Sequence, residues 1–146
     1  MWNKLMIGLL LLLGSQAAFS QVWLGKTDKD FVQFVNDNKE RIKESQFTDK
    51  LFTMVYQEED ELGRLFDVTY RFTIDNNICT SYQQILPAHS YWAATIQEQA
   101  SQQEADASGE TIDVDGETLN THYQFDDYDM LISMENDRLI LQYNKK

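Results

Sequence analysis

Residues 64–86 constrain the fold of this chain more than any other segment, because they have the pattern of a β-hairpin. Apolar side chains alternate with polar ones along the first arm, and this period of two gives a strand one apolar and one polar face. The alternating apolar positions are Phe66, Val68, Tyr70, Phe72 and Ile74. The first arm is therefore predicted to be a strand with one face in the core.

Asp75, Asn76 and Asn77 follow this arm and predict the turn of the hairpin. Asn adopts positive φ more readily than most residues, which favours a three-residue loop with Asn77 in the left-handed region. That loop would pair Ile74 with Ile78, Phe72 with Thr80 and Tyr70 with Tyr82. The second arm would then continue to Pro87, which cannot donate to a strand ladder.

The N-terminus has the pattern of an export signal. Lys4 precedes the apolar run 5–13, and Ala18 and Ser20 supply the small residues that a signal peptidase requires. That run is about half of the ~20 residues that span a bilayer, which favours a cleaved signal over a retained transmembrane helix. We therefore expect removal of residues 1–20. The rest, 21–146, is expected to be one exported domain without a membrane span, in the periplasm or outside the cell.

The charge balance is acidic, with 12 Lys and Arg against 24 Asp and Glu. No Lys or Arg occurs between Phe72 and Asp137. An acidic surface repels phosphate backbones and anionic lipid, so nucleic acid is excluded as a predicted partner.

An amphipathic helix is predicted at about 28–44, with Thr27 as its N-cap. A second helix is predicted at about 89–104, beyond Pro87. Further strands are predicted at 51–56, 119–125, 130–134 and 139–143. Together these elements predict an α+β fold. It is a helix-first, two-layer domain with an antiparallel sheet of five or six strands, and the second helix falls between strands 3 and 4.

Residues 100–118 are small, polar and acidic, and contain no basic residue. Mutual repulsion and little apolar surface predict a mobile loop. Asp113, Asp115 and Glu117 resemble part of a calcium loop, but one alternate ligand is missing and no helix pair brackets them. No metal site is therefore predicted, and protection from proteolysis that appears only with calcium would contradict this prediction.

Cys79 is the only cysteine, so the chain can form no internal disulfide. The thiol is expected to be buried in a strand, with an intermolecular disulfide as the alternative. A catalytic role for Cys79 would need His89 or His122 as a base, and no sequence motif for nucleophilic catalysis surrounds these residues. No catalytic residue and no cofactor are therefore predicted.

Several short segments resemble a known group of proteins. They are Phe19-Ser20-Gln21, Leu24-Gly25-Lys26, Tyr70-Arg71-Phe72 and Asp75-Asn76-Asn77-Ile78-Cys79, with a strand that ends at Pro87. In these features the chain resembles small exported proteins of Bacteroidota bacteria that have no assigned activity. The resemblance implies export, and it implies no activity, cofactor or site residue.

Two classes of function are compatible with these features. The first is a non-catalytic binding module of the cell envelope that recognises a protein or a glycan, with Tyr91 and Trp92 as binding residues because large amphipathic aromatic side chains often serve recognition. In the competing interpretation, Trp92 anchors the second helix in the core. The second class is a small hydrolase or ligand-binding enzyme with a pocket between the helices and the sheet.

Overall fold

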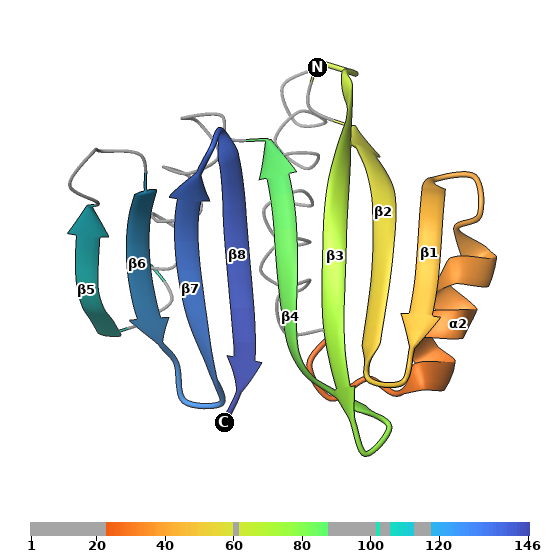
Figure 1. The fold of residues 1–146 in the computed structure, drawn as a ribbon, viewed down its shortest axis with the longest axis horizontal. Coiled ribbons are helices and arrows are strands. Elements are labelled where there is room, and N and C mark those ends of the chain that lie inside the picture. Colours follow the sequence, from red (N-terminus) through yellow and green to blue (C-terminus); the bar gives the residue numbers. More distant parts are fainter. Residues whose placement is uncertain (1–22, 60–61, 88–101, 103–105, 113–117) are drawn as a thin grey trace, which may run out of the picture.

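A computed structural model describes residues 23–59, 62–87, 102, 106–112 and 118–146. Eight strands form a single antiparallel sheet in the order β1-β2-β3-β4-β8-β7-β6-β5 (Figure 1). The strands are β1 (Ile42–Thr48), β2 (Leu51–Glu59), β3 (Leu65–Asp75), β4 (Ile78–Pro87), β5 (Asp106–Ile112), β6 (Thr118–Gln124), β7 (Tyr128–Glu135) and β8 (Arg138–Lys145). The described residues also contain the helix α2 (Asp28–Asp37).

The predicted α+β fold with a five- or six-stranded sheet is wrong, because the described chain is mostly β-structure. The helix predicted to reach residue 44 ends at Asp37, and Ile42–Thr48 forms β1 instead. Asp106–Ile112, in the segment predicted to be a loop, forms β5 and pairs with β6. The predicted second helix, residues 89–104, lies outside the described residues except for Gln102. Mobility of the rest of 100–118 stays a prediction.

Local hydrogen bonds account for the short helix α2. Thr27 and Asp30 form a capping box at its N-terminus, which confirms Thr27 as the N-cap. At the other end, the side-chain amide of Asn38 donates to the carbonyl of Phe34 at 2.9 Å, and the backbone N–H of Asn38 donates to the same carbonyl. Asn competes with helical hydrogen bonding in this way, so the helix stops and the chain turns into β1.

The sheet consists of two four-stranded meanders, β1 to β4 and β5 to β8, whose last strands pair with each other (Figure 1). The pairing of β4 with β8 runs from Ser81 opposite Asn144 to Pro87 opposite Arg138. The last hairpin of each meander therefore lies at the centre of the sheet.

The predicted hairpin at 64–86 is confirmed, but its predicted register is wrong. Asn76 and Asn77 both have positive φ, 51° and 63°, and form a two-residue turn closed by Asp75 and Ile78. Positive φ at both central positions is the signature of the turn that fits the twist of a hairpin. A bulge then follows, since Ile74 pairs with Cys79 but Thr73 pairs with Ser81, which leaves Thr80 as the extra residue.

The bulge explains a break in the sequence pattern. Cys79 and Tyr82 are both buried although three positions separate them, and regular alternation would place them on opposite faces. The extra residue, Thr80, lets both face the core. It also leaves Cys79 able to pair with the N-terminal segment, because its N–H donates to the carbonyl of Lys26 at 2.7 Å and its carbonyl accepts from Gly25 at 2.8 Å.

Aromatic side chains pack α2 and the N-terminal segment on one face of the sheet. Phe31 of α2 and Phe72 of β3 are 1% and 0% exposed, and their ring centroids lie 4.6 Å apart. Trp23 stacks on Phe31 at 5.2 Å and lies 5.1 Å from Phe72. This face, with its buried residues, is called the core face below.

The opposite face is called the uncovered face, because no described element packs on it (Figure 1). Its residues alternate with the core residues and are partly or fully exposed. In the four central strands they include Thr69, Arg71 and Thr73 of β3, Ser81, Gln83 and Ile85 of β4, Ile140, Gln142 and Asn144 of β8, and Leu131 and Ser133 of β7. In the described part of the chain, no helix has the length and apolar character needed to cross a membrane.

Candidate binding site

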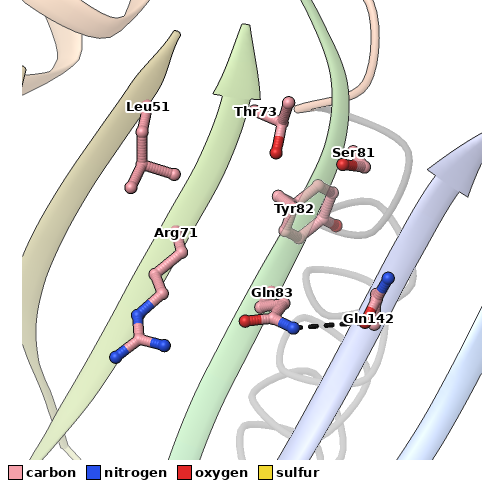
Figure 2. A pocket seen from close by; sticks show the side chains of 7 residues that line it. All are labelled: Leu51, Arg71, Thr73, Ser81, Tyr82, Gln83 and Gln142. Carbon is pink, nitrogen blue, oxygen red and sulfur yellow. Dashed lines mark hydrogen bonds between the residues drawn. The ribbon is translucent and has the colours of Figure 1, made fainter. Parts of the chain in front are cut away.

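A hollow of about 190 Å³ opens on the uncovered face (Figure 2). Four neighbouring strands, β2, β3, β4 and β8, contribute its lining. The lining residues are Leu51, Arg71, Thr73, Ser81, Tyr82, Gln83 and Gln142. We call this cavity the Arg71 hollow.

Two adjacent rows of paired residues build the hollow. In the first row, Leu51 of β2 pairs with Thr73 of β3, which pairs with Ser81 of β4. The second row contains Arg71, Gln83 and Gln142, paired in the same way across β3, β4 and β8. Thr73 and Ser81 have short side chains, whereas the side chains of the second row are long. The sheet surface is therefore recessed beside the second row.

The bulge at Thr80 determines which side chains face the hollow. Beyond the bulge, Ser81 and Gln83 point to the uncovered face and Tyr82 points to the core, where it is 2% exposed. Without an extra residue, a strand that placed Cys79 in the core would also place Ser81 there. A bulge that redirects side chains next to a cavity is a recurrent feature of binding sites.

Side-chain amides form a chain of hydrogen bonds along one side of the hollow. The Nε2 of Gln83 donates to the Oε1 of Gln142 at 3.1 Å, and the Nε2 of Gln142 donates to the Oδ1 of Asn144 at 3.2 Å. Figure 2 shows the Oε1 of Gln83 on the side of Arg71. These bonds fix both carboxamides, and they leave an acceptor oxygen toward the guanidinium.

Arg71 is an exposed cation on a neutral part of the face. Its paired neighbours are Thr53 and Gln83, and the same-face residues before and after it on β3 are Thr69 and Thr73. In the described part of the chain, no carboxylate forms an ion pair with Arg71. Asp67, farther along β3, is already bound to Lys43 at 2.7 Å. The guanidinium therefore has its hydrogen-bond donors available to a ligand.

Cys79, the predicted buried thiol, is fully buried on the core face. Its Sγ lies 3.5 Å from the carbonyl oxygen of Ser81, to which the thiol donates. Burial raises the pKa of Cys79 to about 12. The thiol is thus protonated at neutral pH, and no partner chain could reach it without opening the core.

His122, one of the two histidines considered as a base for Cys79, lies on the uncovered face. It sits on β6 between Thr121 and Tyr123, both buried on the core face, and β6 is separated from β4 by β7 and β8. Cys79 and His122 are therefore on opposite faces of the sheet. His89 lies outside the described residues.

The predicted binding residues Tyr91 and Trp92 also lie outside the described residues, and their role stays a prediction. The same holds for Asp113, Asp115 and Glu117. Within the described ranges, no group of three or more His, Cys, Asp or Glu side chains could hold a metal ion.

Sequence reasoning missed the Arg71 hollow. One signal was available, because Arg71 is the last basic residue before a long stretch without Lys or Arg and occupies a polar position of the alternating strand. The contribution of Gln142 could not have been inferred, since it depends on the pairing of β4 with β8. Comparison of the chain with family models, with curated proteins and with solved structures gives no match.

Proposed function

We propose that this protein is an exported, non-catalytic binding module of the cell envelope, and that the uncovered face of its sheet is the binding surface. The observation that carries the proposal is the Arg71 hollow, a recessed and hydrogen-bonding site on a face that no described element covers. An envelope protein is the partner class that we favour, with a glycan as the alternative.

The chemistry of the uncovered face supports binding of a macromolecule. The chain has a formal net charge of −12, yet the middle of this face carries amides, hydroxyls and partly exposed aliphatic side chains such as Val55, Ile85 and Ile140. Cores of protein interfaces are likewise depleted of charged residues. Covering uncharged polar groups costs less hydration free energy than covering charged ones, and a partner can satisfy the amides and hydroxyls by hydrogen bonds, so this surface suits an interface.

The positions of Cys79 and His122 support a non-catalytic role. A nucleophile and its base must lie within hydrogen-bond reach of each other, and these two residues occupy opposite faces of the sheet. The raised pKa of Cys79 also keeps its thiol in the unreactive, protonated form.

The proposal is tested by placing a charge on each side of the molecule. Ile140→Glu introduces a carboxylate at the centre of the uncovered face, and Val32→Glu introduces one on α2, where Val32 is 58% exposed. Immobilised wild-type protein and both variants are incubated with envelope proteins and polysaccharides, and the retained partner is purified and titrated. Affinity should fall on the order of tenfold or more for Ile140→Glu and stay unchanged for Val32→Glu. The reverse pattern would contradict the proposal.

One observation favours the alternative, a small hydrolase or ligand-binding enzyme with a site on the core face. Glu58 of β2 is the one acid of the described residues whose pKa is raised, because burial disfavours its charged form while Arg41 opposes the shift. Raised carboxyl pKa values are common in catalytic acids. Turnover in a broad hydrolase screen that Glu58→Gln abolishes would establish this alternative over the binding module.

A further inference from the structure

We propose that the Arg71 hollow is a subsite for a single carboxylate of a peptide, either its C-terminus or an acidic side chain. This inference rests on the proposed binding function and assigns the chemistry of its ligand. It follows from the isolated cation, from the hydrogen-bonding groups fixed beside it and from the size of the hollow.

Arg71 is exposed and forms no ion pair with a described carboxylate. Its neighbours on the uncovered face are the uncharged Thr53, Thr69, Thr73 and Gln83. A guanidinium binds a carboxylate through two parallel N–H···O bonds. The hollow thus offers a carboxylate a bidentate partner without a competing acid next to it.

The number of charges selects among anions. Among the described residues, Arg71 is the only charged one that lines the hollow. One guanidinium neutralises a monoanionic carboxylate. A phosphate ester, with a charge near −2, would remain negative in the field of a protein whose net charge is −12. A carboxylate is therefore favoured over a phosphate.

The remaining lining groups favour a peptide. The Oε1 of Gln83, on the side of Arg71, can accept from a backbone N–H of the ligand, and the hydroxyls of Thr73 and Ser81 can donate to its carbonyls. Leu51, at the rim, is 42% exposed and offers apolar contact to an aliphatic side chain. The hollow, of about 190 Å³, has room for one small residue.

A sugar acid is the competing source of a carboxylate. Sugar rings commonly stack on exposed aromatic side chains. Of the described residues that line the hollow, only Tyr82 is aromatic, and it is 2% exposed and faces the core. The lining thus supplies hydrogen bonds and an apolar contact but no exposed ring. This favours the peptide.

The test uses pairs of small probes and the full mature chain. N-acetylleucine is compared with N-acetylleucine amide, which lacks only the negative charge, and glucuronate is compared with glucose. Binding is followed by titration in ¹⁵N-resolved NMR up to about 50 mM probe, since one subsite is expected to give a millimolar Kd. N-acetylleucine should bind, while its amide and both sugars should bind on the order of tenfold more weakly or not at all.

Substitutions of Arg71 test whether the affinity for N-acetylleucine depends on its guanidinium group. Arg71→Leu should lose binding of N-acetylleucine, and Arg71→Lys should weaken it several-fold because a lysine keeps the charge but not the planar fork. Arg138→Leu is the matched control, since Arg138 lies on the same face at the far end of β8, paired with Glu135. It should bind like wild type.

Four outcomes would overturn the inference: equal binding of N-acetylleucine and its amide, tighter binding of glucuronate, unchanged affinity in Arg71→Leu, or no binding by any probe. The experiments distinguish an error in the carboxylate assignment from an error in the proposed binding function. If Ile140→Glu still abolishes partner retention while Arg71→Leu changes nothing, the binding surface stands and only the carboxylate assignment falls.

Discussion

The hairpins β3–β4 and β7–β8 occupy corresponding places in the two meanders and are built on the same turn (Figure 1). Asn76 and Asn77 in the first, and Asn136 and Asp137 in the second, all have positive φ, between 48° and 63°. Pairing is also equivalent, because Arg71 lies opposite Gln83 as Leu131 lies opposite Gln142. The hairpins differ in the bulge at Thr80 and in the side chains on the uncovered face.

The difference shows how one backbone frame can carry two surfaces. Thr73 and Ser81 of the first hairpin correspond to Ser133 and Ile140 of the second. Together with the change from Arg71 to Leu131, this gives the first hairpin only polar side chains at the four matched positions, whereas the second has two aliphatic ones, Leu131 and Ile140. The turn therefore determines the geometry of both hairpins, and the residues on the uncovered face determine where a polar ligand can bind.

The largest expected effect comes from deleting one residue at matched positions. Deleting Thr80 removes the bulge and restores regular alternation, with Cys79 and Tyr82 still on the core face. Deleting Ile140 instead moves Leu141 and Tyr143 out of the core and Gln142 into it. We expect the first variant to fold and the second to be unfolded, as measured by circular dichroism and urea denaturation. Folding of the Ile140 deletion with native stability would contradict the pairing of β7 with β8.

Truncation of matching core residues compares the packing of the two hairpins. Phe72 is fully buried and contacts the rings of Trp23, Phe31, Phe52, Tyr70 and Tyr82. Its counterpart Ile132 is 3% exposed. Phe72→Ala should lower the free energy of unfolding by about 4 kcal/mol and Ile132→Ala by about 3 kcal/mol. A loss below about 1 kcal/mol for Phe72→Ala in urea denaturation would exclude the aromatic core.

Substitutions in the turns should affect both hairpins alike. Val at a positive φ crowds its Cβ against the backbone, so Asn77→Val and Asp137→Val should each cost about 1 to 2 kcal/mol. Gly has no Cβ and should be tolerated at both positions. Thermal unfolding of the four variants measures these changes. A cost confined to one hairpin would show that the turns are not equivalent.

The smallest expected effect is a pH dependence of the free energy of unfolding. Cys79 of the first hairpin can titrate, whereas Leu139, at the matching core position of the second hairpin, cannot. The unfolded thiol loses its proton from about pH 8.5, whereas the folded thiol keeps it until its pKa of about 12. Stability therefore falls as pH rises through this window. Cys79→Val should flatten the decline between about pH 8.5 and 10.

Above that range, the buried tyrosines Tyr70, Tyr82 and Tyr143 should add to the alkaline loss of stability, since burial raises the pKa of each. Urea denaturation from neutral to alkaline pH measures the contribution of Cys79 and that of the buried tyrosines to the free energy of unfolding. An identical pH profile for wild type and Cys79→Val would contradict the buried, protonated thiol.

The sequence pattern predicted what depends on local chemistry. Strict alternation located β3, and the Asn residues located its turn. The predicted register was wrong because the sequence alone does not show that Cys79 and Tyr82 both face the core, which requires a bulge between them. β1 was missed because Ile42–Thr48 carries few apolar side chains and lacks the alternation of a half-buried strand, although it pairs with the next strand, β2. The candidate site was missed for a different reason, since Gln83 and Gln142 are far apart in the sequence and meet only across β4 and β8.

We expect a carboxylate ligand to bind the uncovered face at the Arg71 hollow, which includes Gln142 of β8, and not at the aliphatic side chains of Leu131 and Ile140. A ¹⁵N chemical-shift titration of the protein with N-acetylleucine tests this expectation most directly. Shifts are expected at the backbone amides of Arg71, Thr73, Ser81, Gln83 and Gln142, with those of Ser133 and Ile140 unchanged. Shifts of equal size at Ser133 and Ile140, or shifts confined to core-face residues, would contradict binding at the Arg71 hollow.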